Sequence, residues 1–319
     1  MGKDLGYSEG RDQSKEDIMT TPIEVSSVVP TFAVLPSAAV WARDVSPFVS
    51  TDWVQQNLEN SKVVTVDTRK VEEYKGGHIP GAVSAPFGSW IVERNKLLLE
   101  LPADDDLINL IGSLGIKPYS TVVVVSTADN DYSRADATRV AWTMIVAGLK
   151  NVAVLEGGYA KWLKEQKAVS TEAVSPKEEA YKGKVNKDSL ASKAYVMNRI
   201  GKSVIVDNRD ASVYFGVATE PFAPKAGHIG TAVNLPTPWV YTKEGALLPE
   251  ETLEAMAVGV IGKDRSKEVI CYCGVGGYAS TWWFILTQML GYRNVKFYDG
   301  SAQDWVMDPK APMSAYRWH

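Results

Sequence analysis

Short runs of apolar, mostly β-branched residues alternate along the chain with longer stretches that have the periodicity of an amphipathic helix. Residues 122–125 are four successive valines, and continuous runs of this kind are typical of strands that are buried on both faces. The stretches expected to form helices are 104–114, 134–147, 250–261 and 279–290. Strands that alternate with helices predict an α/β fold, with mostly parallel sheets flanked by helices on both faces.

Four sequence blocks occur twice in the same order, which indicates a tandem duplication. The matched pairs are 62–69 with 202–209, 77–82 with 227–232, 122–125 with 268–271, and 148–162 with 291–305. The first pair ends in Asp-x-Arg, the second begins with Gly-His-Ile, and the last ends in Gly-x-x-x-x-Trp. We therefore expect an irregular N-terminal extension (1–45), a first copy (46–165), a polar linker (166–188) and a second copy (189–319).

Composition narrows the function classes. The chain has 319 residues, a formal net charge of −4, three histidines and two cysteines. The negative charge disfavours binding to nucleic acid or to an anionic membrane. So few histidines and cysteines leave little from which to build a metal site, and they exclude a disulfide scaffold. We expect two soluble domains, no bound metal and no cofactor.

The N-terminal region contains an uncharged stretch at residues 25–42. Pro30 and Pro36 interrupt it, so an irregular tail is favoured over a membrane span. An export signal is the alternative, because residues 40–42 have the small-residue pattern of a cleavage site. We expect a cytoplasmic rather than an exported protein.

Two loops lie where ligands bind in parallel sheets, beyond the carboxyl ends of strands: residues 126–136 and 272–279. The second holds Cys273, followed by Gly274, Gly276 and Gly277. Glycines at these positions allow backbone N–H groups to converge on one point, and the helix that follows adds partial positive charge. We therefore predict a reactive Cys273 with a lowered pKa. The alternative is an inert cysteine beside a flexible loop.

The Asp-x-Arg strand ends, the Gly-His-Ile motifs, the Cys273 loop and the closing Gly-x-x-x-x-Trp together resemble the rhodanese superfamily of sulfurtransferases. The resemblance covers roughly residues 46–319, and it is strongest to the tandem thiosulfate and 3-mercaptopyruvate sulfurtransferases, whose second domain is catalytic. It implies that Cys273 takes a sulfane sulfur from a donor as a persulfide and passes it to a thiophilic acceptor, cyanide or a thiol. A Cys-dependent phosphatase of the related fold is disfavoured, because it needs an arginine where Ala279 stands.

The implied partners are small sulfur donors and acceptors, with a thiol redox protein as another candidate acceptor, and we expect a monomer. The alternative is a carrier or binding module that does not turn over and receives its sulfur from a partner protein. The residues expected to bind the donor or the persulfide are Gly274, Val275, Gly276, Gly277, Tyr278, Arg209 and Lys225. Trp239 is a further candidate for the pocket lining.

The sequence does not decide which sulfur donor is used. Thiosulfate-type relatives read Cys-Arg-Lys-Gly, whereas the loop here is uncharged and is more similar to the mercaptopyruvate-type Cys-Gly-Ser-Gly-Val. A second arginine that both types place after Asp-x-Arg appears here as Val213. Thiosulfate, 3-mercaptopyruvate and a polysulfide all remain candidates.

In the first copy, we place Thr127 at the position of Cys273, in a loop that lacks glycine and is about three residues longer. That copy is expected to be non-catalytic. Asp207 and His228 are expected to support neighbouring loops. Cys271 is assigned to the core, with a second reactive thiol as the alternative.

Overall fold

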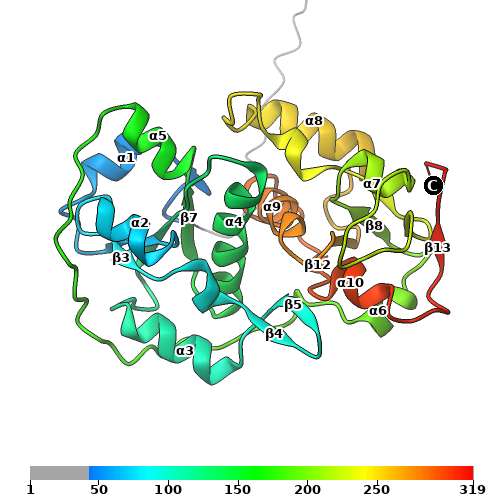
Figure 1. Ribbon diagram of the computed structural model, residues 1–319, viewed down its shortest axis with the longest axis horizontal. Coiled ribbons are helices and arrows are strands. Elements are labelled where there is room, and N and C mark those ends of the chain that lie inside the picture. The colour runs from blue at the N-terminus through cyan, green and yellow to red at the C-terminus, as the bar shows by residue number, and fades with distance from the viewer. Residues whose placement is uncertain (1–42, 319) are drawn as a thin grey trace, which may run out of the picture. The chain divides into compact units, whose positions relative to one another are not determined.

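Each copy contains a parallel β-sheet covered by helices (Figure 1). The computed structural model describes residues 43–318, which belong to one compact unit. The strands are β1 (Phe48–Val49), β2 (Val63–Asp67), β3 (Val83–Ser84), β4 (Val92–Arg94), β5 (Leu97–Glu100), β6 (Thr121–Val125), β7 (Asn151–Leu155), β8 (Val204–Asp207), β9 (His228–Ile229), β10 (Val233–Asn234), β11 (Val269–Tyr272), β12 (Val295–Phe297) and β13 (Met313–Ser314). The predicted duplication is visible in their arrangement.

The strand order is β1-β7-β6-β2-β3 in the first copy and β10-β8-β11-β12 in the second. All pairings within these two sheets are parallel. The order β3-β2-β6-β7 therefore corresponds to β10-β8-β11-β12. The place of β1 is taken in the second copy by a single bridge between Leu190 and Phe297. The predicted fold class, α/β with mostly parallel sheets, is confirmed.

The helices follow the strands in both copies. The α-helices are α1 (Thr51–Gln56), α2 (Val71–Gly76), α3 (Asp104–Ser113), α4 (Asp131–Val146), α5 (Gly158–Lys164), α6 (Lys193–Met197), α7 (Ala211–Phe215), α8 (Glu250–Val260), α9 (Tyr278–Phe284) and α10 (Ser301–Trp305). The 3₁₀ turns are η1 (Phe87–Trp90) and η2 (Thr237–Val240), and η3 (Ile285–Met289) is a π-helical turn that continues α9. None of these helices in the described part of the chain is both long and apolar enough to cross a membrane.

The four predicted helices are α3, α4, α8, and α9 with its π-helical continuation. The valines of β6 are fully buried from Val122 to Val125, as expected for a strand with helices on both faces. Helix α4 begins three residues earlier than predicted because Asn130 caps it: its side-chain oxygen accepts the N–H groups of Tyr132 and Ser133. A side-chain cap of this kind satisfies amides that have no partner within the helix.

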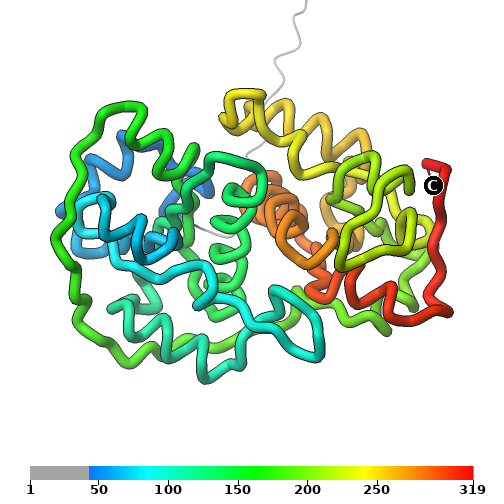
Figure 2. The backbone as a smooth tube through the Cα atoms, in the orientation of Figure 1, coloured from blue at the N-terminus to red at the C-terminus, as the bar shows by residue number. Residues whose placement is uncertain are grey.

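The two copies pack against each other through α4 and α9 (Figure 2). The hydroxyl of Thr138 on α4 lies 2.9 Å from the hydroxyls of both Ser280 and Thr281 on α9. The antiparallel hairpin β4–β5 also reaches the second copy, where Gln303 bonds to both backbone groups of Leu98, at 2.9 and 2.8 Å. The first copy therefore supports the region around the loop that follows β11.

The segment 166–188 contains neither helix nor strand and follows the surface of the first copy. Most of it is exposed, but Tyr181 is buried and donates to the carbonyl of Ala147 at 3.0 Å. The expected irregular extension lies, up to residue 42, outside the described residues.

Candidate functional site

Cys273 is the first residue after β11, at the carboxyl end of a central strand. Its sulfur accepts the N–H of Gly276 at 3.2 Å, and the N–H groups of Val275 and Ala279 are close enough to lower the pKa of the thiol. Three backbone donors thus converge on one sulfur, which is the arrangement predicted from the glycines. Ala279 lies just beyond the expected range 274–278, because the first amides of α9 also face the sulfur.

The pKa of the Cys273 thiol is raised, not lowered as the sequence suggested. Burial raises it first, because the side chain is 2% exposed and an ionised form would lose its hydration. The three backbone donors lower it, and the negative charge of Glu220 raises it. The expectation of a resting thiolate overlooked the burial of the thiol and the charge of Glu220.

Two glycines in the loop are required by close neighbours. Gly276 has φ +84°, and a side chain there would lie 2.8 Å from the carbonyl oxygen of Asp299. At Gly274 an added methyl group would overlap the ring of Phe222 and lie 2.7 and 2.8 Å from the carboxylate oxygens of Glu220. A side chain at Gly276 would strain the backbone, and one at Gly274 would force Phe222 and Glu220 to move.

Arg139, on α4 of the first copy, is hydrogen-bonded to the Cys273 loop. Its buried guanidinium donates to Asp299 at 2.5 Å, to the carbonyl of Gly276 at 3.3 Å, and to the carbonyl of Leu99. Asp299 in turn accepts the N–H of Leu101 at 3.0 Å. One side chain thus connects α4, the β4–β5 hairpin and the Cys273 loop.

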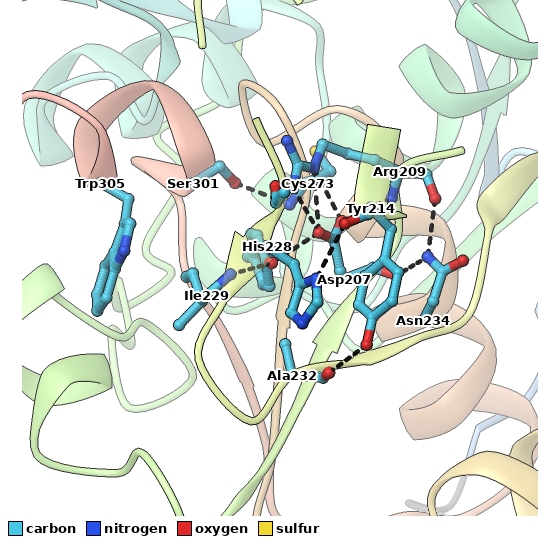
Figure 3. Close-up of polar contacts among 12 residues, drawn as sticks. Asp207, Arg209, Tyr214, His228, Ile229, Ala232, Asn234, Cys273, Ser301 and Trp305 are labelled. Atoms are coloured by element: carbon cyan, nitrogen blue, oxygen red, sulfur yellow. Dashed lines mark hydrogen bonds and ion pairs between the residues drawn. The ribbon is translucent and has the colours of Figure 1, made fainter. Parts of the chain in front are cut away.

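Ser301 is a site residue that sequence reasoning missed. Its hydroxyl accepts the N–H of Cys273 at 3.1 Å (Figure 3). The same hydroxyl donates to the carbonyl of Tyr298 at 2.8 Å. Its φ of +51° lies in the left-handed region, which non-glycine residues rarely adopt. The first copy has Gly158, with φ +54°, at the matching position. The sequence signal that could have identified Ser301 is that it replaces a glycine of the first copy, Gly158.

Asp207 and Arg209 form a buried ion pair beside the loop (Figure 3). The guanidinium contacts both carboxylate oxygens of Asp207, at 2.6 to 3.2 Å, and donates to the carbonyl of Gly227 at 2.8 Å. Asp207 also accepts the hydroxyl of Tyr272 at 2.6 Å. These contacts connect β8, β11 and the loop before β9, and they favour the bracing role predicted for Asp207.

His228 lies in the same network. Its ring stacks on Tyr214 with centroids 3.8 Å apart, and its Nδ1 lies 2.9 Å from the carbonyl of Tyr214. Burial lowers its pKa. These contacts hold the loop at β9, as expected of a supporting residue.

The two basic residues expected at the site are both engaged elsewhere. Arg209 is 1% exposed, and its one remaining nitrogen faces Glu220 at 3.6 Å. Lys225 donates to the carbonyl of Ala311 at 3.2 Å. The charge of Arg209 is thus paired, whereas exposed Lys225 bonds to a backbone carbonyl and keeps its charge, and the role of both residues in anion binding stays a prediction.

The aromatic candidates differ in position. Tyr278 begins α9 and stacks on Tyr132 of the first copy, with ring centroids 5.1 Å apart. Trp239 is 56% exposed, and no aromatic contact is recorded for it among the described residues. Cys271 is fully buried in the core, and burial raises the pKa of its thiol. That placement favours its assignment to the core.

In the first copy, Ser126 and not Thr127 occupies the position of Cys273. Asp67 pairs with Val125 as Asp207 pairs with Tyr272, so the residues that follow, Ser126 and Cys273, correspond. The loops between strand and helix, 126–130 and 273–277, are also equal in length, so the predicted longer loop was wrong. The helix starts earlier instead, because of the Asn130 cap described above.

Comparison with known proteins gives a consistent result. The family described as "Rhodanese-like domain" matches residues 50–165 and 191–308. A Saccharopolyspora erythraea protein named "Putative thiosulfate sulfurtransferase" is 31% identical over 79% of this chain and 90% of its own length. "Sulfur carrier protein TtuD" of Thermus thermophilus is 30% identical over 81% of this chain and 92% of its own. The structure of SseA from Escherichia coli, described among 3-mercaptopyruvate sulfotransferases, superposes with a TM-score of 0.69 at 25% identity, covering 81% of this chain and 99% of SseA.

Proposed function

The chain belongs to the rhodanese-like family, and from that premise we propose that it is a sulfurtransferase whose second copy moves a sulfane sulfur through a persulfide on Cys273. The observation that carries this proposal is the convergence of the Gly276, Val275 and Ala279 N–H groups on the Cys273 sulfur. Backbone donors fixed in this way stabilise negative charge as it develops on a bound sulfur.

The transfer proceeds in two steps. The Cys273 thiol first loses its proton to solvent, and the resulting sulfur attacks the outer sulfur of the donor. The bond between that sulfur and the rest of the donor breaks, and the leaving group keeps the electron pair; from thiosulfate it is sulfite. An acceptor such as cyanide then attacks the persulfide, takes the outer sulfur as thiocyanate, and leaves the Cys273 thiolate. This is covalent catalysis with ping-pong kinetics.

The raised pKa of Cys273 changes one part of this scheme. A thiol that is protonated at rest must be deprotonated before attack, so loading should become faster as the pH rises. The backbone donors then stabilise the ionised sulfur and the persulfide, and they lower the cost of reaching both.

A non-turnover sulfur carrier is the second candidate function. The relative named as a sulfur carrier favours it, and the buried sulfur suits transfer to a partner that seals the site. Steady-state turnover with cyanide separates the two candidates, because a pure carrier loads once and does not cycle with small molecules.

The decisive experiment is the intact mass of the protein after brief incubation with thiosulfate, 3-mercaptopyruvate or a polysulfide. We expect one added sulfur atom on the wild type and none on Cys273→Ser. Cys271→Ala is the matched control and should still load, because Cys271 lies in the core. Loading of Cys273→Ser, or no loading of folded wild type by any donor, would overturn the proposal.

A further inference from the structure

Glu220 carries a half-buried carboxylate that the transfer mechanism does not use. It begins a tight turn in which its carbonyl accepts the N–H of Ala223 at 2.9 Å. The turn places the carboxylate beside the Cys273 loop. Both carboxylate oxygens lie within 2.8 Å of the position that a methyl group on Gly274 would occupy. The charge of Glu220 is close enough to raise the pKa of Cys273.

Arg209 compensates the charge of Glu220 only in part. Arg209 lies 3.6 Å from Oε2, but the same guanidinium is already paired with Asp207 at 2.6 Å. Oε2 is buried and has no hydrogen-bond partner among the residues that the structure describes. With Asp207 and Arg209 cancelling each other, the ionised Glu220 gives the neighbourhood of the sulfur a net negative charge.

The other charged group around this carboxylate adds to that sign. Asp210, which begins the turn into α7, acts on Glu220 and is itself influenced by Asp131 of the first copy. The Cys273 loop, residues 273–277, contains no charged side chain. Among the charged groups that act on Glu220, an anionic ligand therefore meets three carboxylates and one cation, Arg209, which is already paired with Asp207.

We propose that Glu220 makes the Cys273 site select against anionic sulfur donors and acceptors, in favour of those whose carrier group is neutral or cationic. The inference deepens the proposed function and rests on Cys273 as the reacting group. Like charges that approach each other in a partly buried site repel, because water screens them less there than at the surface. The dianion thiosulfate should therefore be a poor donor at the pH where Glu220 is ionised.

The selectivity should depend on pH in a defined direction. Burial raises the pKa of Glu220 to about 7, opposed by Arg209 and reinforced by Asp207 and Asp210. Below that pH the carboxyl group is neutral and the repulsion disappears; above it the charge is present and the repulsion is full. At each pH the rates of a charged and an uncharged reagent are compared on one protein, so the titration of Cys273 affects both rates equally. Comparing this rate ratio between the wild type and Glu220→Gln then isolates the charge of Glu220.

Alkylation of Cys273 by iodoacetate and iodoacetamide tests the inference without any sulfur transfer. The two reagents have nearly the same shape and differ in one negative charge. We expect Glu220→Gln to raise the iodoacetate-to-iodoacetamide rate ratio about tenfold at pH 8.5, and to leave it unchanged near pH 5.5. A peptide digest assigns the label to Cys273. Loading by thiosulfate should become faster in the same variant.

Two further variants complete the test. Glu220→Asp keeps the charge and should keep the wild-type ratio, and Glu59→Gln removes an exposed carboxylate of the first copy and should change nothing. A lower thiol pKa in Glu220→Gln would speed both reagents equally, so it would not change the ratio. An unchanged ratio at pH 8.5, or no alkylation of Cys273 by either reagent, would overturn the inference. A failure of the proposed function would appear differently, as alkylation of Cys273 without loading by any donor.

Discussion

The two copies share their supporting contacts and differ at the residues around one loop. In both, an Asp-x-Arg pair is closed by a 2.6 Å ion pair, Asp67 with Arg69 and Asp207 with Arg209. In both, a histidine of the Gly-His-Ile motif stacks on a tyrosine at 3.8 Å. These motifs recur because they hold the fold, and their presence in a copy therefore says nothing about catalysis.

The difference lies in what the amides at the start of the helix bind. In the first copy, the N–H groups of Tyr132 and Ser133 are taken by the side chain of Asn130. In the second copy, Gly277 stands at the cap and has no side chain, and the N–H of Ala279 reaches the sulfur of Cys273. A capping side chain and a reactive sulfur compete for the same donors.

The strongest test of this comparison moves the cysteine into the first copy. In the Cys273→Ser background, Ser126→Cys places a thiol at the matching strand end, yet we expect no sulfur loading there, because Asn130 still takes the amides. Intact mass after incubation with the donor that loads the wild type is the measurement. Loading of this variant to the wild-type extent would show that strand position alone is sufficient. Adding Asn130→Gly sharpens the test, because it frees the amides without adding a charge.

The second test concerns the support that the first copy gives to the second. Arg139→Met removes the buried partner of Asp299 and the donor to Gly276. Leaving a buried charge unpaired costs about 3–5 kcal/mol, and urea unfolding should show a loss of that size together with slower loading of Cys273. Lys161→Met is the control. It breaks the half-exposed ion pair with Glu156 at 3.6 Å and should cost less than about 1 kcal/mol. Equal losses in the two variants would mean that the first copy does not brace the loop.

The fold and the placement of Cys273 at a glycine-rich strand end could be predicted from sequence because their signals are local. A buried strand, a cysteine and three glycines stand next to one another in the chain. The register of the first copy could not be predicted, because four successive valines give no sign of which one ends the strand. That is why Thr127 was chosen in place of Ser126.

Other features depend on contacts between distant segments. Ser301 contacts Cys273 from a left-handed backbone conformation. A serine in the sequence does not predict that conformation, because non-glycine residues rarely adopt it. Glu220 reaches the loop only because a turn far upstream folds back onto Gly274. The raised pKa of Cys273 needs both its burial and that carboxylate, and neither is readable from the glycine pattern.

The smallest expected effect concerns the residue that follows Cys273 in the second copy and Ser126 in the first. The first copy carries Thr127 there, whereas in the second Phe222 and Glu220 fill the space that a side chain at Gly274 would need. Gly274→Ala should therefore lower the free energy of unfolding by about 1–3 kcal/mol, the usual cost of overpacking. The control Gly259→Ala, on α8 with nothing within 4 Å of its added methyl group, should instead raise it by about 0.5–1 kcal/mol.

A double-mutant cycle identifies the cause of that loss. Phe222→Ala removes the ring that the added methyl group would overlap, so Gly274→Ala should cost less in that background than in the wild type. Urea unfolding of the four proteins measures the coupling, and the rate of sulfur loading reports the shape of the loop. Additive losses would place the strain elsewhere in the loop. A positive coupling would instead identify the turn at Glu220 as the reason that glycine follows cysteine in one copy, while threonine follows serine in the other.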